Sequence, residues 1–362
     1  MQQSLALPQT RRLNLLRILP ISSFLLILVL GSISLLSHFP ALPDLQNHDL
    51  VKGSWAAAFE ADLNKQIGFR QFAIDTWGVL EYGLFKDGRS GVLVGKDNWL
   101  FSDEEFSFYP AEAAETQIKL EYINQVKAEL AAKGIDLVVL LLPAKARVYE
   151  ENLGRYHLPD YTVNRYDNFR QALLASGVSA PDLLTPMLEA KTGGKVFMQT
   201  DTHWTPYGAR VVAGALANEL GSFNLASFSS QLASKETYTG DLLNFIPLGN
   251  FKAMGPGDEQ VQLESTEGQV ASGGLFDTVS VPVTLVGTSY SAIDTWNFEG
   301  ALKTALQTDV LNAALEGKGP IQPMQTYLAD EAFLQSPPEL VIWEFPERFI
   351  PVAYEMDSSA DE

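Results

Sequence analysis

The 362-residue chain contains no cysteine and only four histidines, His38, His48, His157 and His203. Without cysteine there can be no disulfide, no thiol nucleophile and no cysteine-ligated metal site. Basic residues are also scarce: the chain has 25 Lys and Arg against 44 Asp and Glu, which gives a net charge of −19. Such a charge argues against nonspecific binding to nucleic acid. Any chemistry that requires an imidazole must use one of the four histidines.

The N-terminus carries an uncharged apolar run, from residue 18 to residue 36, preceded by Arg11, Arg12 and Arg17. At about 1.5 Å per residue such a run nearly spans a hydrocarbon core of about 30 Å. Arginines on its N-terminal side predict that the preceding segment stays in the cytoplasm. A cleaved signal peptide is the alternative, but the long basic region and the lack of an A-x-A site favour an uncleaved anchor. We therefore expect residues 1–17 in the cytoplasm, a transmembrane helix at 18–37 and a tether at 38–54.

From residue 55 to residue 354 the sequence alternates between helical and strand-like patterns. Helices are expected at 115–133, 166–176, 206–220 and 298–306, and buried apolar strands at 135–142, 195–200, 281–286 and 339–345. This alternation predicts an α/β domain with a mostly parallel sheet and helices on both faces. The Gly-, Ser- and Thr-rich stretch 222–280 is interpreted as an irregular insertion of loops and short β pieces. Residues 355–362 form an acidic tail.

Polar side chains follow each of the predicted strands. If the strands are parallel, their C-terminal ends share one edge of the sheet, where open α/β folds place their active sites. The residues expected to converge there are Lys145, Arg147, Asp201, His203, Ser289 and Arg348.

The segment VPVTLVGTSYS, residues 281–291, has the pattern of a buried strand that ends in a tight turn at Ser289. A serine in such a turn can act as a nucleophile if a base removes its proton and a third group orients the base. Asp201 and His203, two residues apart, can supply the orienting carboxylate and the base. The plainer alternatives are a helix N-cap for Ser289, a helix N-terminal carboxylate for Asp201 and a packed polar residue for His203. A D-x-H pair gives only two metal ligands, so no metal site is expected.

Four motifs together resemble the alginate O-acetyltransferases AlgJ and AlgX, which have an SGNH-hydrolase-like domain. They are GKDNWLF at 95–101, DTHW at 201–204, GTSYS at 287–291 and WEFPER at 343–348. The resemblance runs in order from about residue 55 to residue 348. The D-x-H pair precedes the serine, an inverted motif order relative to ordinary SGNH hydrolases. The N-terminal anchor and the lack of room for a C-terminal carbohydrate-binding module resemble AlgJ more than AlgX.

The resemblance implies a catalytic triad of Ser289, His203 and Asp201. It also implies acetyl transfer to an exported polysaccharide, alginate, by a domain that lies in the periplasm and is anchored by a single pass through the inner membrane. The acetyl group would come from a multispanning MBOAT-type acyltransferase, so no cofactor is expected, and further partners would be polysaccharide biosynthesis and export proteins. The backbone of Tyr290 is the expected oxyanion donor.

Two questions stay open at this level. The same triad with water as acceptor would make a polysaccharide deacetylase, and a chain with an idle triad would be a non-catalytic scaffold. The net charge of −19 opposes binding of a polyanion, unless Lys145, Arg147 and Arg348 reverse the local potential. Ordinary charge pairing is the alternative for each of them, and a neutral polysaccharide is the alternative acceptor.

Overall fold

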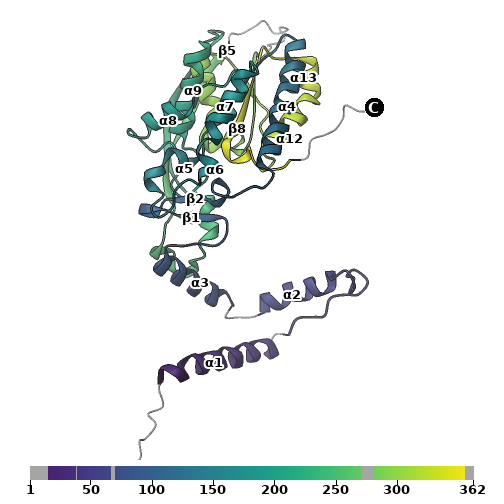
Figure 1. The fold of residues 1–362 in the computed structure, drawn as a ribbon, viewed down its shortest axis with the longest axis vertical. Coiled ribbons are helices and arrows are strands. Elements are labelled where there is room, and N and C mark those ends of the chain that lie inside the picture. The colour runs from purple at the N-terminus through teal and green to yellow at the C-terminus, as the bar shows by residue number, and fades with distance from the viewer. Residues whose placement is uncertain (1–14, 38, 67–69, 271–280, 355–362) are drawn as a thin grey trace, which may run out of the picture. The chain divides into compact units, whose positions relative to one another are not determined.

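The computed structural model describes residues 15–37, 39–66, 70–270 and 281–354 (Figure 1). Most of the expected cytoplasmic segment and the whole acidic tail lie outside these residues. The chain divides into two compact units, Met1–Val79 with Leu248–Asn250, and Leu80–Pro247 with Phe251–Glu362. The expected functional residues all belong to the second unit, whereas the predicted domain boundary at residue 55 falls within the first.

The N-terminal unit contains the helices α1 (Leu15–Ser37), α2 (Ser54–Gln66) and α3 (Arg70–Leu80). Within α1 the apolar run is interrupted by Pro20, and the hydroxyls of Ser22 and Ser23 donate back to the Leu19 carbonyl. Among the residues that the structure describes, none of the helices combines the length and the apolarity needed to cross a membrane. The expectation of a single-pass inner-membrane protein, with its domain held in the periplasm by this anchor, is therefore wrong.

The centre of the second unit is a four-stranded parallel sheet, which confirms the predicted α/β class. Its strands are β3 (Asp136–Leu142), β8 (Leu340–Pro346), β6 (Val283–Val286) and β7 (Val310–Asn312), in that order across the sheet. Strands β3, β6 and β8 are short, mostly apolar and almost fully buried, as expected for a parallel sheet with both faces covered.

Helices cover both faces of the sheet, and alternate residues of β3 show which face is which. Leu137, Val139 and Leu141 pack with α4 (Glu112–Ala132), α7 (Arg165–Ala175), α12 (Ile321–Leu328) and α13 (Glu331–Gln335). Val138 and Leu140 pack on the other face with α8 (Leu184–Ala190), α9 (Pro206–Leu220) and α11 (Phe298–Leu306). Figure 1 shows β8 with α9 on one side and α4 and α12 on the other.

Two features of the sheet differ from the prediction. Residues 195–200 are not a sheet strand. They form a tight hairpin with the DTHW motif, with an isolated antiparallel bridge between Phe197 and Trp204. The two arms of this hairpin bond to each other and not to the sheet: Met198 N–H donates to His203 O, and Thr205 N–H donates to Val196 O. The fourth strand is instead β7, which was missed because it has three residues and exposes Leu311.

The stretch 222–280 is more regular than predicted over its described part. It contains β4 (Ala226–Tyr238) and β5 (Glu259–Val270), which pair as a long antiparallel ribbon. A smaller hairpin joins β1 (Val92–Val94) to β2 (Leu100–Ser102). The remaining short α-helices are α5 (Lys145–Val148), α6 (Asp160–Val163) and α10 (Ser289–Ala292).

Candidate active site

Ser289 lies where the sequence places it, directly after β6. The strand ends at Val286, Gly287 and Thr288 form the turn, and Ser289 is the first residue of the short helix α10. Thr288 caps this helix by accepting a hydrogen bond from the Tyr290 N–H at 3.4 Å. As the first residue of a helix, Ser289 has no intrahelical acceptor for its own N–H. The turn thus presents a half-buried hydroxyl beside backbone N–H groups.

A buried carboxylate accepts hydrogen bonds from this turn. Glu344, in the middle of β8, accepts hydrogen bonds from Thr288 N at 2.7 Å, Thr288 Oγ1 at 3.0 Å and Ser291 Oγ at 3.1 Å. Gly287 makes room for it, since a Cβ there would lie 2.5 Å from the carboxylate oxygen. Burial raises the pKa of Glu344 to about 7. Glu344 therefore bonds to residues on both sides of Ser289, to the backbone of Thr288 and to the hydroxyl of Ser291.

His203 connects Ser289 to Asp201. Its Nε2 lies 2.7 Å from Ser289 Oγ, and its Nδ1 lies 2.6 Å from Asp201 Oδ1. Because a carboxylate can only accept, Nδ1 carries the proton and Nε2 is left to accept from the serine hydroxyl. The imidazole packs against two aromatic rings, with centroid distances of 4.7 Å to Tyr290 and 5.5 Å to Trp296. The structure thus brings the three predicted residues into one line of contacts.

Asp201 is fully buried and its two oxygens are both used. Oδ1 also accepts the His203 backbone N–H at 2.8 Å, and Oδ2 accepts the Asp241 N–H at 2.7 Å. Burial alone would raise the pKa of Asp201, but the hydrogen bond and charge of His203 outweigh it and keep this pKa below its usual value. The carboxylate therefore stays ionised beside the imidazole.

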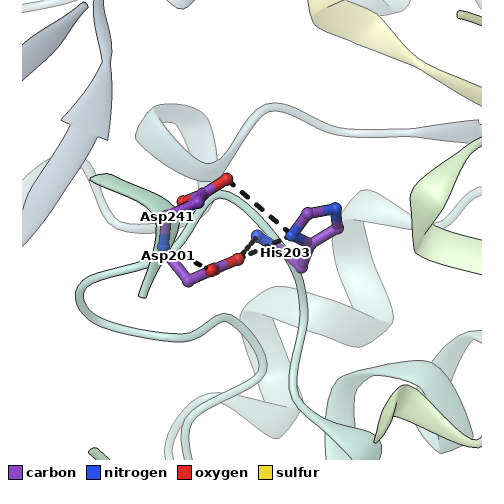
Figure 2. Close-up of side chains that lie close together, drawn as sticks. All are labelled: Asp201, His203 and Asp241. Carbon is purple, nitrogen blue, oxygen red and sulfur yellow. Dashed lines mark hydrogen bonds and ion pairs between the residues drawn. The ribbon is translucent and has the colours of Figure 1, made fainter. Parts of the chain in front are cut away.

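Asp241 is the third member of the cluster drawn in Figure 2. Its carboxylate accepts from Thr202 N at 2.8 Å and from Thr202 Oγ1 at 2.6 Å, and one oxygen lies 4.0 Å from His203 Nδ1. Burial and the negative charge of Asp201 raise its pKa. Gly240 allows this close approach, since a Cβ there would lie 2.2 Å from the Thr200 carbonyl oxygen.

Asp201, His203 and Asp241 also form a group whose ligand atoms are close enough to hold a metal ion. Their contacts, however, are already those of a hydrogen-bond network. The N–H groups of His203, Thr202 and Asp241 donate to the carboxylate oxygens, and Nδ1 is bonded to Asp201. A cation would have to displace these donors, so the arrangement fits a protonated Nδ1 better than a metal ligand.

Two of the three predicted substrate-binding cations are used inside the protein. Lys145 is 1% exposed, and its ammonium donates to the carbonyl oxygens of Leu100, Gln199 and Asp201. Burial lowers its pKa to about 8. All three ammonium protons are thereby used, so Lys145 positions the Asp201 loop and is not available to a polysaccharide.

Arg147 is likewise committed to internal contacts. It bonds to both carboxylate oxygens of Glu347 and to the carbonyls of Thr162 and Val163. It therefore joins the loops after β3 and β8. The expectation that Lys145 and Arg147 bind substrate fails because sequence does not reveal whether a cation already has internal acceptors.

Arg348 has a different environment. With Ser289 and Thr288 it lines a cavity of about 390 Å³, together with Lys318, Gln322 and Tyr354. Arg348 is therefore the only one of the three predicted cations that the described structure places in a cavity with Ser289.

Several residues around the site escaped the sequence analysis. Glu344 sits inside a strand, where a charged residue is usually taken as facing solvent, and Lys318 follows the unpredicted strand β7. Asp241 and Glu259 hold the hairpin loop, Glu259 by accepting from Gln199 N and Thr200 N. Of these residues only Glu344 could have been noticed in the sequence, because it is the single acidic residue in the apolar run LVIWEF.

We expect Glu344→Gln to change how stability depends on pH. Because the pKa of Glu344 is raised to about 7, the folded state holds its proton more tightly than the unfolded state, and this residue makes the wild-type chain lose stability as pH rises towards 7. The variant lacks that loss. Its free energy of unfolding relative to wild type should therefore rise by roughly 2–3 kcal/mol between pH 5 and pH 8.

Urea denaturation of both chains at the two pH values measures this difference. Glu316→Gln, at an exposed glutamate, is the control and should follow the wild-type profile. If the difference in the free energy of unfolding between wild type and Glu344→Gln is the same at pH 5 and at pH 8, the pKa of Glu344 does not change on folding and the prediction is wrong.

Comparison with known proteins places this geometry in a family. Residues 92–347 match the family model described as the SGNH hydrolase-like domain of the acetyltransferase AlgX. The probable alginate O-acetylase AlgJ of Azotobacter vinelandii is 44% identical over 322 residues, 86% of this chain and 82% of the relative. The alginate biosynthesis protein AlgX of Pseudomonas putida is 31% identical over 271 residues, 70% of this chain and 56% of the relative.

A solved structure of a relative has the same fold. The O-acetyltransferase domain of Pseudomonas putida AlgJ is 41% identical and superposes with a TM-score of 0.69, covering 75% of this chain and 95% of that domain. The expected SGNH-hydrolase-like fold is thereby confirmed.

Proposed function

Because the chain belongs to the AlgJ and AlgX family of alginate O-acetyltransferases, we propose that it transfers acetyl groups to hydroxyls of alginate through an acetyl-serine intermediate. The observation that carries the proposal is the line of contacts from Ser289 Oγ through His203 to Asp201, at 2.7 and 2.6 Å. This is the geometry that a serine needs to become nucleophilic near neutral pH.

In the first half of the reaction Ser289 Oγ attacks the acetyl carbonyl of the donor while His203 Nε2 takes the hydroxyl proton. The tetrahedral intermediate collapses, the bond to the donor breaks, and His203 returns the proton to the leaving group. Asp201 stabilises the imidazolium that exists between these steps and keeps Nδ1 protonated. The backbone N–H of Ser289 is the proposed donor to the oxyanion, because the Tyr290 N–H already donates to Thr288 Oγ1 at 3.4 Å.

In the second half a sugar hydroxyl replaces the donor. It loses its proton to His203 Nε2 and attacks the acetyl-serine carbonyl, and Ser289 Oγ leaves with that proton. The cycle needs no cofactor, because the serine itself carries the acetyl group. We propose a multispanning MBOAT-type acyltransferase as the donor, and other polysaccharide biosynthesis and export proteins as further partners.

A chromogenic acetyl ester with an oligomannuronate acceptor tests this function. We expect the purified chain to cleave the ester and to place acetyl groups on the oligosaccharide, detected by mass spectrometry. Acetyl recovered only as free acetate at saturating oligosaccharide would identify a deacetylase instead. Failure to cleave the ester at all would favour a non-catalytic scaffold.

A further inference from the structure

The cavity beside Ser289 is built from three neighbouring strand ends. Arg348 follows β8, Ser289 follows β6 and Lys318 lies in the loop after β7, so the parallel sheet brings all three to one edge. Its lining contains these two cations and no carboxylate. In a chain of net charge −19, this cavity is locally cationic.

Arg348 is buried, and one of its N–H donors has no hydrogen-bond partner among the residues that the structure describes. The residue is 8% exposed, and its Nε is a buried donor without a hydrogen-bond partner in the described structure. Its guanidinium packs over the Tyr290 ring at 5.6 Å and the Phe349 ring at 4.7 Å. A buried guanidinium N–H without an acceptor is costly. Its planar fork matches the geometry of a carboxylate or a phosphate, and of these two groups a uronate acceptor carries the carboxylate.

The carboxylates around Arg348 do not fill this role. Glu104 is the nearest, at 3.7 Å from Nε, which exceeds hydrogen-bond distance, and its side chain is about half exposed. Glu105 and Asp241 act on Arg348 only through their charge. Glu105 is bonded to the N–H groups of Lys145 and Ala146, and Asp241 to Thr202. The guanidinium thus forms a long ion pair with Glu104, and its Nε has no hydrogen-bond acceptor among the described residues.

We propose that Arg348, assisted by Lys318, binds a carboxylate of the uronate acceptor and so holds a sugar hydroxyl against the acetyl group on Ser289. This inference rests on the proposed function, since it assumes an acceptor that carries carboxylates. It explains how a chain of strong negative charge can bind a polyanion: one buried cation and one exposed cation reverse the potential at the nucleophile.

The remaining walls fit a sugar that must be held close to the reacting atoms. Tyr354 closes one side and packs against Gly319, where a Cβ would lie 2.3 Å from the tyrosine ring. Gly319 has a φ of +64°, which a residue with a side chain adopts only with strain. Aromatic rings with a flanking polar group, here Gln322, are common contacts for carbohydrate rings and hydroxyls.

Binding of mannuronate oligosaccharides, measured by calorimetry without any acetyl donor, tests the proposal separately from catalysis. The comparison ligand is the same oligosaccharide with its carboxylates reduced to alcohols. We expect the wild-type chain to bind the charged form at least about tenfold more tightly, and Arg348→Gln to weaken that binding by about 10- to 100-fold. Lys318→Gln, at an exposed position that does not threaten folding, should give a smaller loss in the same direction.

Arg165→Gln is the matched control, because Arg165 is also buried but is already bonded to Glu112 at 2.7 and 2.9 Å. It should leave the affinity for both ligands unchanged. Equal affinity of the wild type for the two ligands, no measurable binding of either at millimolar concentration, or normal binding by both cavity variants would overturn the carboxylate site. If Arg348 instead served only the reaction oxyanion, Arg348→Gln would bind the charged oligosaccharide normally. Failure of acetyl transfer in the ester assay, with charge-selective binding intact, would count against the proposed function alone.

Discussion

Replacing Ser289 by Ala should lower cleavage of an acetyl ester by about 10⁴- to 10⁶-fold, as expected when a nucleophile is removed from an intact triad. The reason is geometric: Ser289 Oγ is the hydroxyl 2.7 Å from His203 Nε2. The measurement is the initial rate with a chromogenic ester, with circular dichroism to verify folding.

Ser291→Ala is the control for this prediction, because it removes a second hydroxyl from the same short helix. Ser291 Oγ donates to Glu344 at 3.1 Å and not to the imidazole, so its loss should reduce the rate by no more than about tenfold. Comparable losses in both variants would mean that the helix, and not the Ser289 hydroxyl, is what the reaction requires.

Asp201→Asn should be the second most damaging change, with an expected loss of about 10³- to 10⁴-fold in kcat. Asp201 Oδ1 faces two N–H donors of His203, and Oδ2 faces the Asp241 N–H. The asparagine amide has one oxygen, which can accept from the donors on only one of these two sides. Its NH₂ group then lies against the N–H donor on the other side, and no hydrogen bond forms there. The variant also loses the negative charge that stabilises the imidazolium.

Asp241→Asn distinguishes this role from a general effect of charge near His203. Asp241 bonds to Thr202 and lies 4.0 Å from Nδ1 without accepting from it. Its replacement should therefore cost about tenfold or less. If Asp241→Asn is as inactive as Asp201→Asn, the orienting role belongs to the pair of carboxylates and not to Asp201.

The part of the fold that was predictable from sequence is the part with a strong local pattern. The apolar runs that became β3, β6 and β8 are long enough, and bounded clearly enough by glycine or proline, to identify a parallel sheet. Parallel strands impose a common edge, and this rule alone placed Ser289 and Arg348 together. The short strand β7 lacks such a pattern, so Lys318 was missed with it.

His203 was predicted to meet Ser289, but by a route that the structure corrects. Residues 195–200 have the composition of a strand, yet their hydrogen bonds are made within a hairpin and to Lys145 and Glu259. These partners lie far away in the sequence, and no local pattern reveals them. The same limitation explains the error at Lys145 and Arg147, whose internal acceptors come from loops that only the folded chain brings near.

The central claim is that Ser289 carries the acetyl group between donor and acceptor. The most direct measurement is peptide mass spectrometry of the full chain, quenched with acid shortly after mixing with an activated acetyl ester. The account predicts one acetyl group on the peptide that contains Ser289, its absence from Ser289→Ala, and its disappearance when oligomannuronate is added before the quench. Ester cleavage at the wild-type rate without any acetyl group on Ser289, or an acetyl group that persists in the presence of the oligosaccharide, would contradict it.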